Sequence, residues 1–151
     1  MKLDQTDKKI LRLIQQDASL SVGAVAEHVN LSKSACWRRI QRFEEEGLIR
    51  QKITVLDPKK LGFNLIVFIS IRTNQHNNTW AENFKQTVDL IPEIIEVYRM
   101  GGDVDYLIKA IVADISGYDQ LYQQLIQADL FEVTAGFVME NVKTTNQLPI
   151  Y

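Results

Sequence analysis

Residues 31–43 carry side-chain types that bind nucleic acid, at a spacing that suits a helix. The stretch reads Leu-Ser-Lys-Ser-Ala-Cys-Trp-Arg-Arg-Ile-Gln-Arg-Phe and holds four cations but no Asp or Glu. At 100° per residue, Cys36, Ile40 and Phe43 share one line, which predicts a buried side and an outward opposite side. Arginine reads guanine edges or phosphate, glutamine reads adenine, and serine contacts either. We expect DNA contacts from Ser32, Lys33, Ser34, Trp37, Arg38, Arg39, Gln41 and Arg42.

This helix face has a second interpretation, because charged faces are also typical of helices that are merely solvated. Two of the expected contacts carry alternatives of their own. Arg39 lies beside the buried line, so its stem can cover apolar surface instead. Trp37 can pack on a neighbouring helix or lie near sugar and phosphate. The residues before position 31 therefore decide between the interpretations.

The first thirty residues predict two helices that hold this one. Residues 4–17 have apolar side chains at helical spacing, with Asp4 and Asp7 in the first turn, where the helix dipole favours anions. Ser21 is a favoured N-cap for a second helix of about two turns, which ends near Val29.

The third helix has its own start and stop signals. Ser32 is its N-cap, and the helix is predicted to run to Glu46. Gly47 fits the position after the last helical residue, and Leu48 is expected to fold back as the hydrophobic contact of a Schellman ending.

Three short helices, with a short turn between the second and third, predict a helix-turn-helix whose third helix enters the major groove. A purely structural three-helix bundle is the alternative. Such a bundle gives no reason for Lys33, Arg38, Arg39 and Arg42 to gather without an intervening acid. The cation pattern therefore favours DNA binding.

Composition narrows the class of protein. The 151 residues are 46% hydrophobic, enough for one or two packed domains. No run is long enough to cross a bilayer, the first residues lack a secretory signal, and the single cysteine excludes an internal disulfide. We therefore expect a cytoplasmic, nucleoid-associated protein. Residues 1–52 hold ten Lys/Arg against seven Asp/Glu, whereas residues 53–151 hold seven against twelve, so only the front is expected to meet a polyanion.

The middle of the chain predicts a domain boundary. Residues 48–55 alternate as a strand, which suits either a small wing or a connector that pairs with a partner chain. The turn-rich sequence Asp-Pro-Lys-Lys-Leu-Gly at residues 57–62 follows it. We predict a DNA-binding domain over residues 1–56, with the wing or linker strand, and a second domain over residues 57–151.

The second half predicts the order strand, helix, strand, strand, helix, strand. The strands are expected over residues 63–73, 93–100, 104–113 and 131–139. The capping boxes Thr79-x-x-Glu82 and Ser116-x-x-Asp119 open the two helices, and Pro92 ends the first of them. This order predicts a ferredoxin-like βαββαβ sandwich, so the whole chain is expected to be α+β.

The first strand of this half is apolar on both faces. One face consists of Phe63, Leu65, Val67, Ile69 and Ile71, and the other holds Ile66 and Phe68. One face must cover the helices, and the other needs a second protein surface. The pattern therefore predicts a dimer in which sheet packs on sheet.

Residues 101–106, Gly-Gly-Asp-Val-Asp-Tyr, have groups for both ends of an amino acid. The paired glycines let backbone N–H groups turn toward one carboxylate, and Asp103 and Asp105 can bind an ammonium group. The same sequence is also typical of a plain hairpin turn between two strands.

Taken together, these motifs resemble one family. The run Leu31-Ser-x-Ser-x-Cys-x-Arg-Arg-Ile-x-Arg-Phe-Glu-x-x-Gly-Leu-Ile49, preceded by Leu3-Asp-x-x-Asp7, is similar to the recognition-helix region of the leucine-responsive/asparagine-regulator (Lrp/AsnC) transcription factors. The chain departs from the family pattern at Trp37, at Phe43, where leucine is more usual, and at Gly23, which weakens the second helix.

The resemblance covers nearly the whole chain, because the family's effector and assembly domain has the same order of elements. It implies a sequence-specific regulator with a winged helix-turn-helix and homodimers that assemble to an octamer or a similar particle. It also implies an amino-acid effector bound between neighbouring dimers by the Gly-Asp-x-Asp-Tyr loop. At the positions of this chain, the effector site would comprise Met100, Gly101, Gly102, Asp103 and Asp105, with Thr134 and Gly136 from the last strand.

Two other functions fit parts of the sequence. Enzymes of the same two-domain form decarboxylate tetrapyrroles. However, His28 and His76 are the only histidines, and neither has a partner at catalytic or metal spacing, while Cys36 lies on the buried line. A nucleoid-organising protein without a ligand shares the features of the first half and differs in specificity. We expect no catalytic residue, metal or cofactor.

Overall fold

The computed structural model describes residues 2–151, which form two compact units. Unit 1 comprises the residues up to Val55 together with Lys143–Tyr151, and unit 2 comprises Leu56–Val142. From the sequence, all residues after 56 are expected in the second domain. The structure instead places the last nine residues with unit 1, because this tail packs against the first helix.

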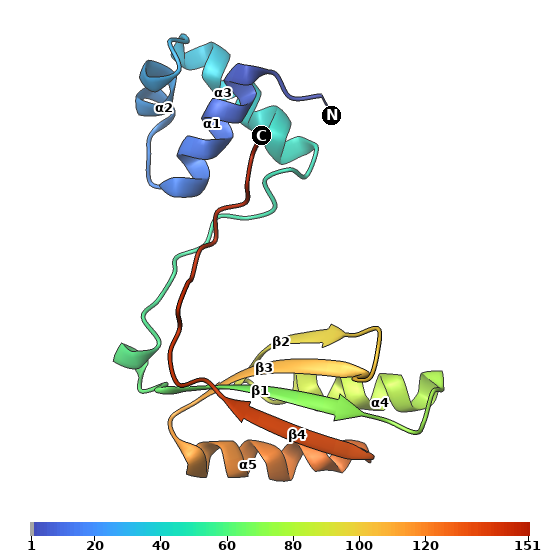
Figure 1. Ribbon diagram of the computed structural model, residues 1–151. Helices are drawn as coiled ribbons and strands as arrows, with labels where there is room; N and C mark the ends of the chain where they lie inside the picture. The colour runs from blue at the N-terminus through green and yellow to red at the C-terminus, as the bar shows by residue number, and fades with distance from the viewer. Residues whose placement is uncertain (1) are drawn as a thin grey trace. The chain divides into compact units, whose positions relative to one another are not determined.

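Unit 1 contains three helices, labelled in Figure 1: α1 (Gln5–Gln16), α2 (Val22–His28) and α3 (Lys33–Glu45). The predicted N-caps are confirmed for α2 and α3. The Ser21 hydroxyl accepts from the N–H of Ala24 at 3.1 Å, and the Ser32 hydroxyl accepts from the N–H of Ala35 at 3.2 Å. The helix-turn-helix therefore forms where the sequence predicted it.

The core of unit 1 confirms the buried line of the third helix. Cys36 and Phe43 are fully buried and Ile40 is 6% exposed, packed with Ile10 of α1 and Val25 of α2. This packing fixes which side of α3 faces outward.

The end of α3 differs in one detail from the prediction. Gly47 adopts a positive φ of 69° after the helix, as expected for a glycine at this position. However, Leu48 is 44% exposed, and it is Ile49 that packs on the core while its N–H donates to the carbonyl of Phe43 at 3.0 Å. The chain therefore folds back one residue later than predicted.

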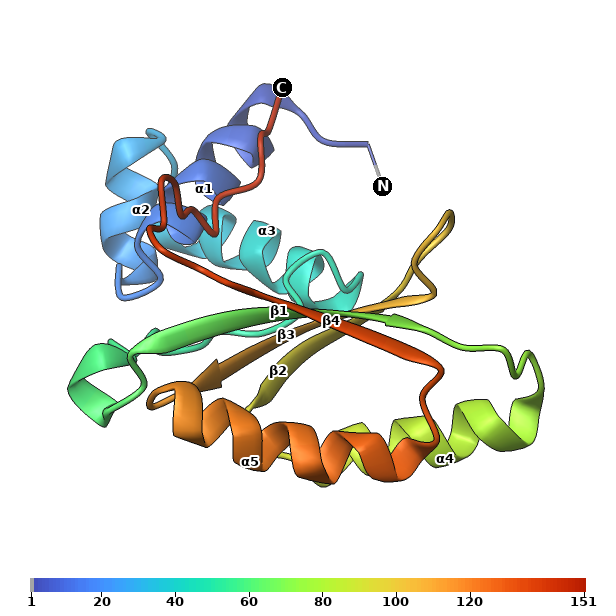
Figure 2. The ribbon, with the colours of Figure 1, turned by 60° about the horizontal axis from the view of Figure 1, so that its bottom comes forward.

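The C-terminal tail lies beside α1 in both ribbon views (Figures 1 and 2). The Gln15 side chain donates to the carbonyl of Leu148 at 2.9 Å and accepts from its N–H at 3.0 Å. Arg12 donates to the carbonyl of Ile150 at 2.6 Å, and the Ile150 side chain packs on the unit 1 core. Two distant parts of the sequence therefore build this unit.

The predicted strand over residues 48–55 is wrong for the single chain. Residues 50–57 have no regular secondary structure, and Ile53 and Val55 are 64% and 70% exposed. An alternating sequence becomes a strand only when a neighbouring strand accepts and donates its backbone hydrogen bonds. The chain supplies no such neighbour among its described residues.

Unit 2 has the predicted βαββαβ order, and its fold class is confirmed. Its elements are β1 (Leu65–Arg72), α4 (Asn78–Asp89), β2 (Ile94–Arg99), β3 (Tyr106–Val112), α5 (Ile115–Leu125) and β4 (Glu132–Phe137), with short 3-10 turns η1 (Lys59–Leu61) and η2 (Ile126–Ala128). The sheet order is β2-β3-β1-β4 with antiparallel neighbours, and α4 and α5 cover the same face (Figure 2).

Both helices of unit 2 begin before the predicted capping boxes. The Asn77 side chain caps α4 by accepting from the N–H of Trp80 at 2.9 Å, and Asp114 caps α5 by accepting from the N–H of Gly117 at 2.9 Å. Thr79 and Ser116, the predicted caps, lie inside the first turns. Asn and Asp are as favourable as Ser and Thr at the N-cap position, so Asn77 and Asp114, which come first in the chain, cap the helices.

The two faces of the sheet differ in what covers them. Val67, Ile69 and Ile71 of β1 are fully buried beneath α4 and α5, as predicted. Phe68, on the opposite face, remains 38% exposed. Alternation along the paired strands gives this face, hereafter the open face, the residues Ile66, Phe68, Ser70, Arg72, Glu96, Tyr98, Leu107, Lys109, Ile111, Glu132, Thr134 and Gly136.

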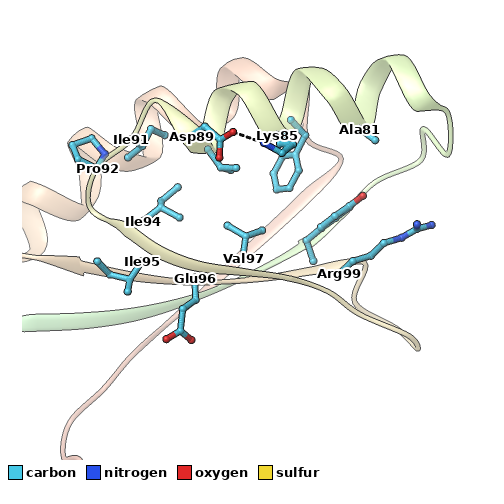
Figure 3. Close-up of a pocket in the computed structure, with 13 residues that line it drawn as sticks. Ala81, Lys85, Asp89, Ile91, Pro92, Ile94, Ile95, Glu96, Val97 and Arg99 are labelled. Atoms are coloured by element: carbon cyan, nitrogen blue, oxygen red, sulfur yellow. Dashed lines mark hydrogen bonds and ion pairs between the residues drawn. The ribbon is translucent and has the colours of Figure 1, made fainter. Parts of the chain in front are cut away.

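A groove of about 600 Å³ lies between α4 and the edge strand β2 (Figure 3). Ile94 and Val97 point from β2 into it, whereas Glu96 points away. The Lys85 ammonium pairs with Asp89 at 2.6 Å on the helix side. The groove contains none of the predicted site residues. No helix within residues 2–151 is long and apolar enough to span a bilayer.

The tail contacts predict that the variant Ile150→Ala loosens unit 1. Removing this partly buried side chain is expected to cost about 1 kcal/mol of packing. Amide exchange in peptides from α1, followed by mass spectrometry, should become faster. The control Leu148→Ala alters a side chain that is 74% exposed and keeps the backbone hydrogen bonds, so it should leave exchange unchanged. Equal exchange in Ile150→Ala and the wild-type chain would contradict a stabilising role for the tail.

Candidate DNA-binding surface and effector site

The first turns of α3 present exposed polar and cationic side chains. Ser32, Lys33, Ser34 and Arg38 are exposed, and Trp37 is 52% exposed. Among the described residues, Lys33 and Arg38 form no ion pair. These two cations are therefore available to an external anion.

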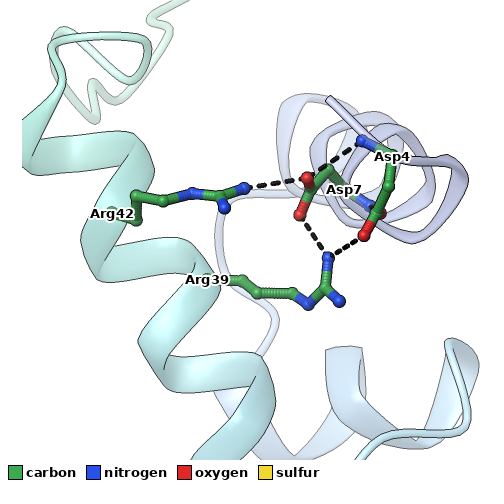
Figure 4. Close-up of polar contacts among 4 residues, drawn as sticks. All are labelled: Asp4, Asp7, Arg39 and Arg42. Carbon is green, nitrogen blue, oxygen red and sulfur yellow. Dashed lines mark hydrogen bonds and ion pairs between the residues drawn. The ribbon is translucent and has the colours of Figure 1, made fainter. Parts of the chain in front are cut away.

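Arg39 and Arg42 are instead bound to the start of α1 (Figure 4). One amino group of Arg39 donates to both carboxylates, at 2.6 Å to Asp4 Oδ2 and 2.6 Å to Asp7 Oδ1. Arg42 donates to the other oxygen of Asp7 at 2.8 Å. The four residues form a single group, hereafter the α1–α3 ion-pair cluster.

The two carboxylates of this cluster also cap α1. Asp4 Oδ1 accepts from the N–H of Asp7 at 2.7 Å, and Asp7 Oδ2 accepts from the N–H of Asp4 at 3.1 Å, which is a reciprocal capping box. The side chain of Asp7 is only 2% exposed. A buried carboxylate needs such partners, because an unpaired charge inside a protein is strongly unfavourable.

The partners lower the pKa of both carboxyl groups. At Asp4, the hydrogen bond from Arg39 is the main cause of the lower pKa. At Asp7, burial acts most strongly and raises the pKa, but the hydrogen bonds from Arg39, Asp4 and Arg42 together outweigh it. Both groups are therefore charged at neutral pH and neutralise the arginines beside them.

The expected acid-free surface of the third helix is thus wrong for its second half. Four cations lie near each other in the sequence, but the fold brings two acids from α1 to two of them. Gln41, another expected contact, is half-buried and donates to Glu44 at 3.1 Å. No local sequence signal predicts this pairing, since Asp7 and Arg39 are 32 positions apart.

In unit 2, the predicted effector loop joins β2 to β3. The N–H of Met100 donates to the carbonyl of Asp105 at 2.8 Å, and Gly102 has a φ of 117°, which favours glycine. Met100, Gly101, Gly102 and Asp103 are exposed. The loop is therefore a tight turn between two strands, and its polar groups are accessible to solvent.

The two loop carboxylates have different surroundings. Asp105 accepts from the N–H of Thr73 at 2.8 Å, and its own N–H donates to the carbonyl of Ile71 at 2.9 Å. It therefore ties the loop to the end of β1. The side chain of Asp103 makes no hydrogen bond with another described residue and remains the more accessible of the two.

Arg72 is a candidate that sequence analysis missed. Its Nε donates to the backbone carbonyl of Asp103 at 2.7 Å, and its amino group pairs with Glu132 at 3.1 Å. The alternation of β1 places Arg72 on the same face as Phe68, which was a usable signal. Its position beside the 100–105 loop follows only from the antiparallel register of β1 and β3.

A cavity of about 230 Å³ lies on the open face beside this loop. Its lining residues are Ser70, Arg72, Val104, Glu132 and Thr134. The structure thus brings Thr134 to the loop, and Gly136 follows two positions along β4 opposite Phe68. A guanidinium and a carboxylate at one small cavity offer opposite charges to a polar ligand.

Of the residues considered for catalysis, Cys36 lies in the core and His28 lies against the backbone of its own helix. Cys36 is fully buried, and burial raises the pKa of its thiol. Nδ1 of His28 lies 2.7 Å from the carbonyl of Ala24 in its own helix. Over residues 2–151, no three potential ligands gather in a way that could hold a metal ion.

Family models match both units of the chain. Residues 3–50 match a winged helix-turn-helix DNA-binding model, and residues 66–148 match the Lrp/AsnC ligand-binding domain. The glutamate uptake regulatory protein of Zymomonas mobilis is 46% identical, over 99% of this chain and 92% of that protein.

Solved structures agree with these matches. The crystal structure of an AsnC family transcriptional regulator from Agrobacterium tumefaciens has 44% identity and a TM-score of 0.92, over 97% of both chains. A Neisseria meningitidis transcriptional regulator in complex with L-Met has 29% identity and a TM-score of 0.91, over 98% of this chain and 97% of that chain.

The matches decide between the regulator and the enzyme. They extend over both units, and the first unit matches a DNA-binding model, so the chain is a regulator rather than a catalyst. With the fold, the matched models and the relatives in agreement, the chain belongs to the Lrp/AsnC family of transcriptional regulators.

Proposed function

We propose that this regulator binds specific DNA sequences as a homodimer, and that an amino acid bound beside the 100–105 loop changes its assembly and DNA occupancy. The observation that carries the DNA-binding part is the exposed start of α3, with Lys33 and Arg38 unpaired among the described residues. In a helix-turn-helix, this segment of the recognition helix approaches the base edges. Binding to chromosomal DNA implies a cytoplasmic, nucleoid-associated location.

The expected contacts divide into two groups by their surroundings. Ser32, Lys33, Ser34, Trp37 and Arg38 are exposed and suit direct contact with bases or phosphates. Arg39, Gln41 and Arg42 have protein partners, so we assign them secondary roles. Arg38 is the best candidate for base recognition, because it projects from the middle of the exposed side.

The open face of unit 2 supports the homodimer. Phe68 and Tyr98 are 38% and 48% exposed on a sheet face that neither α4 nor α5 covers. Packing two such faces together would remove this apolar surface from water. The symmetry of a dimer would present two recognition helices to two half-sites, and further assembly to an octamer or a similar particle would bend or wrap the DNA.

The loop and its cavity support an amino-acid effector. Backbone N–H groups near Gly101 and Gly102 suit a carboxylate, and Asp103 can bind an ammonium group. One matched relative is a complex with L-Met, and another is named for the regulation of glutamate uptake. An amino acid that binds one assembly state better shifts the assembly equilibrium, and DNA biases the same equilibrium.

The DNA-binding proposal predicts that Arg38→Ala weakens binding to DNA from the region upstream of the gene. Loss of a guanidinium contact to a base should reduce specific affinity by about 5- to 150-fold, equivalent to 1–3 kcal/mol, and should reduce sequence preference. Gel-shift titrations at fixed salt would measure both effects. Lys9→Ala on α1 is the control, since it removes the same charge from the same unit. Unchanged affinity and preference in Arg38→Ala would exclude this role, and equal affinity of the wild-type chain for all sequences would indicate a nucleoid-organising protein.

The dimer proposal predicts that Phe68→Arg produces monomers. An arginine at position 68 would lie opposite Lys109 on this face, so two like charges would be brought against the facing sheet when the faces pack. Sedimentation velocity should show loss of the dimer, and specific DNA affinity should fall because the two half-sites are no longer bound together. Leu90→Arg, at a side chain 80% exposed after α4, is the matched control and should remain dimeric. A monomeric wild-type chain at micromolar concentration would contradict the proposal.

The effector proposal predicts a loss of amino-acid binding in Asp103→Ala. A thermal-shift screen of the wild-type chain against the twenty amino acids should identify at least one that stabilises it. Asp103→Ala should abolish that shift while DNA binding without the effector persists, because the ammonium partner is lost and α3 is unchanged. Asp119→Ala, an exposed carboxylate on α5, should retain the shift. Undiminished binding of the amino acid to Asp103→Ala by calorimetry would remove the loop as its site.

A further inference from the structure

The α1–α3 ion-pair cluster removes two cations from the helix that the family uses on DNA. Arg39 and Arg42 together carry two positive charges, and Asp4 and Asp7 carry two negative charges at 2.6–2.8 Å from them. The cluster is therefore neutral as a whole. Its members come from opposite ends of the helix-turn-helix, so the fold and not the local sequence creates this neutrality.

The geometry leaves Arg39 little freedom to bind elsewhere. A single amino group of Arg39 donates to both carboxylates, and the side chain is only 30% exposed. A phosphate that drew this amino group of Arg39 away from the carboxylates would have to replace two short charge-assisted hydrogen bonds, which are the stronger kind. Asp4, in contrast, is 54% exposed, so the anion that competes with phosphate lies at the surface.

Arg42 is held in a similar way. Its amino group donates to Asp7, and its guanidinium carbon lies 5.4 Å from the centroid of the Phe43 ring. Its Nε is buried and has no hydrogen-bond partner among the described residues. An arginine that binds a phosphate or a guanine as a fork offers two parallel N–H groups. With one N–H buried and one amino group on Asp7, Arg42 is poorly placed to do so.

We propose that Asp4 and Asp7 act as internal counter-anions that limit the attraction of this helix-turn-helix for DNA of any sequence. Asp4 is a positioning residue that competes with phosphate for Arg39. The phosphate attraction then comes from the cations outside the cluster, and the base contacts of Arg38 make a larger share of the total affinity. This inference rests on the proposed DNA contact of α3 and adds a determinant of its specificity.

The testing variant is Asp4→Asn, which removes the charge but keeps a favoured N-cap for α1. Binding to a duplex of random sequence would be measured at several salt concentrations. Without the Asp4 charge the cluster keeps one unbalanced positive charge, although Asp7 still binds Arg39. Contact of that charge with a phosphate should steepen the slope of log K against log salt by up to about 0.9 per protomer, which corresponds to at most about eightfold tighter binding at about 0.1 M salt. Asp4→Ser, another favoured cap, should give the same gain.

Two controls separate this effect from a change in net charge or in folding. Asp17→Asn makes the same charge change at the other end of α1, where the carboxylate accepts only from Ser19, so it should leave the salt slope unchanged. In an Arg39→Ala background, Asp4→Asn should give no steeper slope. A change that was merely structural would weaken binding, whereas the proposal requires a gain.

The outcomes distinguish this inference from the proposed function. If Arg38→Ala reduces specific binding but Asp4→Asn and Asp4→Ser bind random DNA no more tightly than the wild-type chain, the counter-anion role is overturned and the DNA contact stands. An equal gain in Asp17→Asn, or a gain that persists without Arg39, overturns it as well. If the wild-type chain binds no DNA in a salt-dependent way, the proposed function itself fails.

Discussion

Burial of one side of α3 is the constraint on which the DNA-binding unit depends. Cys36, Ile40 and Phe43 lie at i, i+4 and i+7 and are almost completely buried against α1 and α2. A helix is rigid, so fixing this line also fixes the direction of every other side chain on it. Turning α3 about its axis would bury Lys33 or Arg38 without partners, which is far more costly than the packing gained. The hydrophobic core therefore selects which cations face outward.

Asp7 connects this packing to electrostatics. Its carboxylate is buried, so it must be paired, and the fold pairs it with the α1 N-terminus, Arg39 and Arg42 at once. Removing one partner of a buried ion pair is more costly than the pair itself is stabilising. The Asp7 carboxylate therefore holds the start of α1 to the middle of α3. Its loss would destabilise both helices. The helix dipole alone would explain an acid such as Asp7 in the first turn of α1. In this fold, Asp7 also binds two arginines that are distant in the sequence.

Local signals in the sequence predicted much of this fold, and long-range pairing explains what was missed. Ser21 and Ser32 were identified as caps because a cap bonds within three residues. The order of strands and helices, and the buried faces of β1 and α3, followed from periodicity. The caps Asn77 and Asp114 were missed because Thr79 and Ser116 fit a more familiar pattern nearby.

The site was less predictable than the fold. Residue type and spacing do not show that Arg39 and Arg42 are ion-paired whereas Arg38 is not, because the partners lie more than thirty positions away. Arg72 was missed because its link to the Asp103 carbonyl depends on the register between β1 and β3. The strand predicted over residues 48–55 has no neighbouring strand among the described residues. In each case the missing information is the position of a second segment.

The tail limits how strongly unit 2 can influence α1 through the end of the chain. The chain passes between the units twice, before Leu56 and after Val142. The second passage follows β4, the strand that carries Thr134 and Gly136. A shift of β4 can pull on α1 through this passage. The free energy transmitted in this way cannot exceed the free energy that holds the tail on Arg12 and Gln15. Three exposed hydrogen bonds, each about 0.5–1.5 kcal/mol net, and one partly buried side chain hold it. The resulting limit of a few kcal/mol is large enough for the 1–3 kcal/mol that typical allosteric coupling requires.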